Sequence, residues 1–185
     1  MKISKQQAFA WFKKSYLKLI FAIVALILLS LLLGTSVKTL VFAIVLILLA
    51  SFSTFYFNYV TAPVNFELVK MSTILMAYTH GIIAGLIVGI AATIIGKILI
   101  GRIDEKLPIS VAAISIVAVA AGLFSAANIV VLGILLVGFY NISLFSISMT
   151  TGGDLGWNIP YEGTNFAINF ILFTRIAPFI LPLLQ

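Results

Sequence analysis

The stretch IIAGLIVGIAATIIGKILI, from Ile82 to Ile100, contains a single charged side chain, Lys97, and is long enough to cross a bilayer. A spanning helix needs about 20 predominantly apolar residues. Similar runs recur along most of the 185-residue chain, and short polar connectors separate them. A soluble core could not remove that much apolar surface from water. The sequence therefore predicts an all-α fold, a polytopic integral membrane bundle of six to seven transmembrane helices.

The composition excludes several classes of function. Apolar residues make up 63% of the chain and charged residues 9%. Cysteine is absent and histidine occurs once, which excludes thiolate catalysis, cysteine–zinc sites and an all-histidine metal site within one chain. No nucleophile, zinc-protease or phosphate-binding motif occurs. We therefore expect no catalytic residues, no metal and no cofactor, and a protein that is not an enzyme.

The chain is expected to divide after Lys18. Residues 1–18 hold five lysines among aromatic side chains, which predicts a basic interfacial segment lying on the membrane surface. Residues 19–185 are expected to form a single transmembrane helical domain. Because most of the net charge of +6 lies beside the first span, we expect the lipid bilayer as a partner and no nucleic acid. The apolar runs that we count as crossings are 19–33, 39–57, 66–79, 82–100, 109–126, 129–149 and 165–184.

The lysines also indicate an orientation in the cell membrane. A lysine-rich amino terminus is expected to stay in the cytoplasm. If each apolar run crosses once, Lys70, Arg102 and Lys106 fall on the same side as the amino terminus and Lys38 falls outside. The sequence therefore predicts a multi-pass protein with a cytoplasmic amino terminus.

One glycine pattern predicts close helix packing. Gly81, Gly85 and Gly89 are four residues apart, so they line one face of a helix and let another backbone approach closely. This face either docks a partner subunit or packs against another helix of the same chain. We take the three glycines as candidate partner-docking residues.

The last apolar run contains the most unusual charge. Arg175 lies near its middle, where an unpaired arginine costs at least about 2.5 kcal/mol. It needs an anion, a carboxylate or a water-filled cavity, and Glu67 and Glu162 are the acidic side chains near span ends. The two interpretations are a ligand-binding cation in a polar pocket and a structural ion pair.

Polar residues around Arg175 predict a small-molecule pocket. Tyr140 and Asn141 are expected to interrupt one span, and Asn165 and Asn169 share a face of the next. The connector 150–164 is expected to form a lid of flat aromatic and polar side chains. The alternative is an interfacial loop that anchors at the headgroups. The candidate ligand-binding residues are Tyr140, Asn141, Asp154, Trp157, Asn158, Tyr161, Glu162, Asn165, Asn169 and Arg175.

The stretch from Thr61 to Asp104 resembles the substrate-binding S components of energy-coupling-factor (ECF) transporters. The similar features are a polar loop at Asn65, a short helix from Glu67, and the glycines 81, 85 and 89 in an apolar background. Membrane proteins of the MreD cell-shape type have a similar glycine pattern.

The resemblance implies a binder of a vitamin or other micronutrient that works with a membrane scaffold subunit and paired cytosolic ATPases. It implies a ligand site under the loops 58–65, 102–108 and 150–164, with the glycine face toward the scaffold. We therefore expect a membrane solute-binding subunit with a small-molecule ligand. The alternatives are a scaffolding membrane protein and a lipid-modifying enzyme in which Arg175, Asp154 and Glu162 converge on a headgroup.

Overall fold

The structure is a computed structural model that describes residues 24, 28, 34–101, 103 and 106–185. The chain divides into two units, Met1–Val41 and Phe42–Gln185, which are considered separately. This division lies beyond the boundary expected after Lys18. The predicted interfacial segment 1–18, and the apolar run 19–33 apart from Val24 and Leu28, lie outside the described residues.

In the first unit, a capped turn begins helix α2 (Val37–Ser53). Ser36 lies directly before this helix, and its Oγ accepts a hydrogen bond from the backbone N–H of Thr39 at 3.1 Å. A serine at this position satisfies one of the amide groups that the first turn leaves without a partner. Gly34, with φ of 61°, turns the chain just before the cap. These two residues explain why α2 starts where it does.

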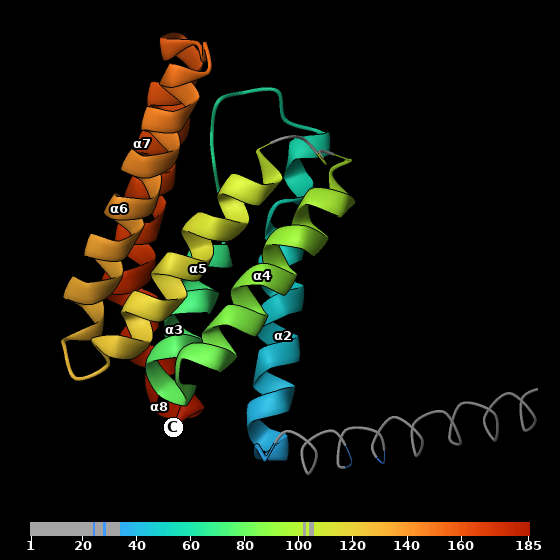
Figure 1. Cartoon of the computed structure of the whole chain (residues 1–185), viewed down its shortest axis with the longest axis vertical. Coiled ribbons are helices and arrows are strands. Elements are labelled where there is room, and N and C mark those ends of the chain that lie inside the picture. The colour runs from blue at the N-terminus through green and yellow to red at the C-terminus, as the bar shows by residue number, and fades with distance from the viewer. Residues whose placement is uncertain (1–23, 25–27, 29–33, 102, 104–105) are drawn as a thin grey trace, which may run out of the picture. The chain divides into compact units, whose positions relative to one another are not determined.

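The second unit is a helical bundle (Figure 1). Its elements are the rest of α2, the short 3₁₀ turn η1 (Phe55–Asn58), α3 (Val69–His80), α4 (Ile82–Leu99), α5 (Leu107–Leu123), α6 (Ile129–Thr150), α7 (Leu155–Ile171), the π-helical turn η2 (Leu172–Ile176) and α8 (Ala177–Leu184). Four apolar helical runs in the described chain are long enough to cross a membrane: Val37–Asn58, Ile82–Leu99, Ile129–Thr150 and Leu155–Leu184. The expectation of an all-α, multi-span membrane protein is thus confirmed.

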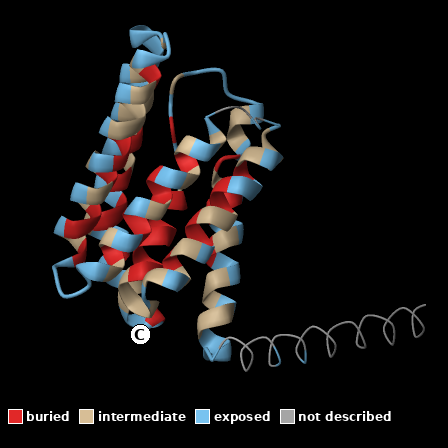
Figure 2. Ribbon diagram, viewed as in Figure 1, coloured by how far each residue is buried: buried red, intermediate tan, exposed pale blue. Residues whose placement is uncertain are grey.

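Helix α3 forms the centre of the bundle. Nine consecutive residues, Val69–Ala77, are buried, and α3 packs against α4, α5, α6 and α8. Buried residues, drawn in red, gather in the interior of the bundle (Figure 2). At 1.5 Å per residue the 12 residues of α3 cover about 18 Å, less than the roughly 30 Å of a hydrocarbon core. Residues 60–68 before it are not helical. The predicted crossing 66–79 is therefore a non-helical segment followed by a short helix that its neighbours shield.

The glycine face packs inside this chain. A Cβ at Gly85 would lie 2.4 Å from the Cβ of Ala77, and one at Gly89 would lie 2.7 Å from Oγ1 of Thr73, both on α3. Both glycines are buried, so α4 lies against α3 at a distance that only glycine permits. Gly81, with φ of 87°, makes the reversal between the two helices. Of the two alternatives for Gly81, Gly85 and Gly89, packing within the chain therefore holds for Gly85 and Gly89, which corrects the docking expectation for these two; Gly81 is exposed at the turn.

The connector expected at 150–164 is mostly helix. Asp154 accepts a hydrogen bond from the backbone N–H of Gly156 at 2.9 Å and caps α7, so only a short turn separates α6 from α7. The expected lid is therefore absent from this part of the chain, because an N-cap starts the helix ten residues earlier than the apolar pattern does. Tyr140 and Asn141 likewise lie within an uninterrupted α6.

Candidate functional site

A cavity of about 260 Å³ lies in the second unit. Its walls come from the residues before α3, the last turns of α4, the first turn of α5, the second half of α6 and the start of α7. The polar and charged residues that line it are Thr54, Asn65, Glu67, Thr93, Lys97, Lys106, Ser110, Tyr140, Ser148, Trp157, Asn158, Tyr161 and Glu162. The helix ends that meet here are those joined by the segments 58–68, 100–106 and 151–154.

Side chains replace the missing helical hydrogen bonds of the segment before α3. The hydroxyl of Tyr56 donates to the carbonyl of Val64 at 2.6 Å and accepts from the N–H of Phe66 at 2.7 Å. Oγ of Ser53 accepts from the N–H of Leu68 at 2.9 Å. Within a membrane protein, non-helical backbone persists only where protein buries it or where it lines a cavity. In this segment Asn65 is buried, Asn65 and Glu67 line the cavity, and residues 60–62, 64 and 66 are exposed.

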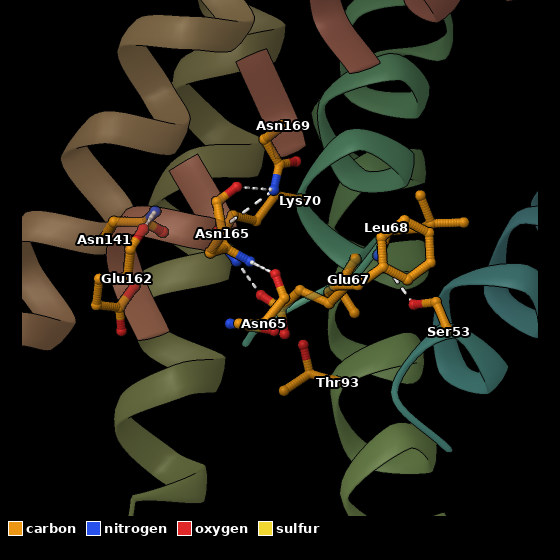
Figure 3. A network of polar contacts seen from close by, with 12 residues as sticks. Ser53, Asn65, Glu67, Leu68, Lys70, Thr93, Asn141, Glu162, Asn165 and Asn169 are labelled. Carbon is orange, nitrogen blue, oxygen red and sulfur yellow. Dashed lines mark hydrogen bonds and ion pairs between the residues drawn. The ribbon is translucent and has the colours of Figure 1, made fainter. Parts of the chain in front are cut away.

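Asn65, at the middle of that segment, is tied to α7. Its N–H donates to Oγ1 of Thr164 at 3.1 Å, and its carbonyl accepts from Nδ2 of Asn165 at 3.4 Å. Nδ2 of Asn169 in turn donates to the backbone carbonyl of Asn165 at 3.0 Å (Figure 3). Asn165 and Asn169 are both completely buried. Asn165 and Asn169 share a helix face, as expected, and this face supports one wall of the cavity.

Lys70 is the buried cation of the bundle. Its side chain is 1% exposed and forms an ion pair with Glu67, three residues earlier. Its Nζ also lies 4.5 Å from the ring centroid of Tyr140, a cation–π contact. The charge of Glu162 on α7 acts on the same ammonium group. Lys70 thus connects α3 to residues of α6 and α7 at the cavity.

The predicted site residues fall into three groups. Tyr140, Trp157, Asn158, Tyr161 and Glu162 line the cavity. Asn141, Asn165 and Asn169 are buried and belong to the hydrogen-bond network around it; Asn141 donates to the backbone carbonyl of Glu162 at 3.3 Å. Asp154 and Arg175 are exposed and lie outside the cavity lining.

Arg175 differs most from its expected position. It lies on the π-helical turn η2, and its side chain is exposed on the surface of the bundle. Among the described residues the ion pair of Glu67 is with Lys70 and not with Arg175. The buried cation among the described residues is Lys70, which the sequence analysis uses only to predict orientation. The spacing Glu67-x-x-Lys70, one helical turn, was the available signal.

Two hydroxyl side chains of the cavity were also missed. Thr93 on α4 and Ser110 on α5 are buried and line it. Each also donates to a backbone carbonyl four residues earlier, Gly89 and Lys106 respectively. Such side chains are common in membrane helices, so the sequence alone did not distinguish them.

No protein-family model, curated protein sequence or solved structure matches this chain. The resemblance to ECF S components therefore depends on the residues quoted from the sequence.

Proposed function

We propose that this chain is an integral membrane solute-binding subunit that takes up a small polar molecule in the cavity between α4, α5, α6 and α7. The observation that supports it most is the cavity of about 260 Å³, whose walls combine two carboxylates, two lysines, hydroxyls, two amides and aromatic rings. Ligand sites are concave, with a few polar groups placed among apolar and aromatic ones. The volume is suited to a compact metabolite.

The cost of this arrangement favours a binding role over a purely scaffolding one. A non-helical segment and a buried lysine are both expensive inside a membrane protein, and such features mark ligand and ion pathways. Non-helical segments that line a cavity recur in transporters. A scaffolding protein could fill the same space with apolar side chains, and α3 could begin several residues before Val69.

A lipid-modifying enzyme receives less support. That alternative required Arg175, Asp154 and Glu162 to converge on one headgroup. Glu162 lines the cavity, but Asp154 caps α7 and Arg175 lies exposed on η2. The three side chains therefore do not share a site.

A transport partner remains part of the proposal. The resemblance to S components implies a scaffold subunit with cytosolic ATPases. Because Gly85 and Gly89 pack against α3, the docking surface for that subunit would have to lie on another face. Exposed apolar side chains are available for lipid or for such a partner, among them Ile87, Ile116, Leu135 and Phe179.

Native mass spectrometry of the protein purified in detergent tests the binding role. We expect a low-mass adduct on the wild type that is lost from Ile109→Trp, because Ile109 lines the cavity and the larger ring would fill it. The matched control is Ile116→Trp on the same helix, which is 53% exposed and should keep the adduct. A wild type without any adduct, or an adduct that Ile109→Trp retains, would contradict the proposal.

A further inference from the structure

The cavity region is short of hydrogen-bond donors. Three buried side-chain atoms in the described part of the chain lack a partner, and all three are acceptors: Oδ1 of Asn65, of Asn141 and of Asn169. Asn65 itself lines the cavity and is only 3% exposed. A buried acceptor without a donor is costly, so each such group calls for a partner. Of the three, Asn65 is the one in the cavity lining, and a ligand that brings an N–H group would supply its missing donor.

The orientation of two of these amides is fixed by their neighbours. Nδ2 of Asn141 donates to the backbone carbonyl of Glu162 at 3.3 Å, and Nδ2 of Asn169 donates to that of Asn165 at 3.0 Å. Turning either amide over would place its oxygen against a carbonyl oxygen, which repels it. The unpartnered atoms of Asn141 and Asn169 are therefore oxygens, and in the structure the unpartnered atom of Asn65 is likewise its amide oxygen.

The charges around the cavity leave one carboxylate in excess on the α3–α7 side. Glu67 is paired with Lys70, and Lys70 also contacts the ring of Tyr140. Glu162 also lines the cavity, and the hydrogen bond formed at Glu162 among the described residues uses its backbone carbonyl and not its carboxylate. On this side the lining therefore carries two carboxylates, of which that of Glu67 is ion-paired with Lys70. In a site removed from bulk water, a further positive charge would balance the second carboxylate.

Aromatic rings next to Glu162 suit the same kind of ligand. Tyr161 and Trp157 line the cavity on α7, and the ring of Tyr161 stacks with that of Phe57 at a centroid distance of 5.9 Å. The faces of such rings attract cations. The two lysines of the lining, Lys97 and Lys106, lie instead on the last turn of α4 and at the start of α5. Acidic and basic side chains therefore come from different walls.

We infer that the ligand carries a protonated amine or a guanidinium group and binds it between the carboxylate of Glu162 and the amide oxygen of Asn65. This inference rests on the proposed function, because it names the class of molecule that the same cavity takes. The cation donates a hydrogen bond to Oδ1 of Asn65, which otherwise has no partner, and its charge offsets the carboxylate of Glu162. The rest of the ligand lies toward the lysine-bearing wall.

A competition among defined small molecules tests the inference. Purified protein is dialysed against an equimolar mixture of amines, guanidines, neutral amides and alcohols, and carboxylates, all small enough for a cavity of about 260 Å³. The molecules that remain bound after rapid gel filtration are identified by mass spectrometry. We expect amines or guanidines to be enriched, and we expect Glu162→Gln to reduce that enrichment about tenfold or more. Asp154→Asn is the matched control, because it removes a carboxylate from the same helix outside the cavity and keeps a good N-cap.

The possible outcomes separate the two proposals. Enrichment of neutral molecules or carboxylates, or equal enrichment by Glu162→Gln and the wild type, would overturn the cationic ligand and leave the binding role standing. The absence of any enriched molecule, together with the absence of a native adduct, would overturn the binding role itself. Enrichment of amines that is lost in Glu162→Gln and kept in Asp154→Asn would support both.

Discussion

The two ends of the Phe42–Gln185 unit differ in how their helices meet. At the cavity end, defined by the cavity lining, the chain before α3 is not helical, Glu67 and Glu162 are half-buried, and Lys70, the partner of Glu67, is buried. At the opposite end, which we call the glycine end, helices meet through glycines. A Cβ at Gly85 would collide with Ala77, one at Gly122 with Ile82, and one at Gly133 with the ring of Phe173, all within 2.6 Å.

The difference shows how one small bundle can hold a polar site in a membrane. Between membrane helices, association depends on close packing and on internal hydrogen bonds, because lipid provides little hydrophobic driving force. The glycine end supplies the close packing. The cavity end can then keep a non-helical segment, since side chains of α2, η1 and α7 form hydrogen bonds with its backbone groups.

The largest expected effect comes from the buried charge at the cavity end. Lys70→Met would leave the carboxylate of Glu67 without its partner and should destabilise the fold by about 3–5 kcal/mol. The double variant Lys70→Met/Glu67→Gln should recover most of that loss, because both charges are gone. Thermal unfolding in detergent measures the difference. Equal stability of Lys70→Met and the wild type would show that the ion pair does not hold α3 in place.

At the glycine end, a single added methyl group should lower the free energy of unfolding. Gly85→Ala would place its Cβ 2.4 Å from that of Ala77 and close to backbone atoms that cannot move away easily. We expect a loss of about 1–3 kcal/mol from overpacking. Gly163→Ala on α7 is the control, because no atom lies near the added methyl group and the helix should gain slightly. If both variants unfold alike, α3 and α4 are not in the close contact described.

A smaller loss of stability is expected when the hydrogen bonds that hold the non-helical segment are removed. Tyr56→Phe removes the hydroxyl that bonds both Val64 and Phe66, which should cost roughly 1–3 kcal/mol and loosen the segment. Tyr59→Phe is the matched control, because that ring is 76% exposed. Hydrogen–deuterium exchange of the residues around Asn65 should be faster in Tyr56→Phe alone. Unchanged exchange in Tyr56→Phe would show that the Tyr56 hydroxyl does not hold the non-helical segment in place.

The smallest effect should follow from the exposed arginine. Because Arg175 lies outside the cavity, Arg175→Leu should leave ligand retention in native mass spectrometry unchanged within about twofold, a difference of roughly 0.4 kcal/mol. Loss of the adduct in this variant, with the fold intact, would show that Arg175 takes part in ligand binding and would contradict a binding site confined to the cavity end.

The sequence predicted where helices occur better than which faces they bury. Apolar runs placed α4 and α6 almost to the residue. The start of α7 was missed because its first turns are polar, and a cap such as Asp154 can begin a helix without any apolar pattern.

Burial was harder to predict for a physical reason. Lys70 and Arg175 both lie in apolar surroundings, and the sequence pointed to Arg175 as the buried cation. Neighbouring helices cover α3 on all sides, whereas η2 presents one side to the exterior. The sequence pattern of one helix does not show where its neighbours lie. The four-residue spacing of Asn165 and Asn169 therefore predicted their shared face, whereas no spacing predicted the cavity next to Glu67.

Single-cysteine labelling tests the central contrast most directly, because the natural chain contains no cysteine. Ser110→Cys and Ala118→Cys place a thiol on the same helix, the first in the cavity lining and the second among fully buried apolar residues. A charged, water-soluble methanethiosulfonate should modify the cysteine at position 110 quickly and leave the one at position 118 unmodified in the folded protein. Equal reactivity at both positions, or no reaction at position 110, would contradict a polar cavity held open by a close-packed end.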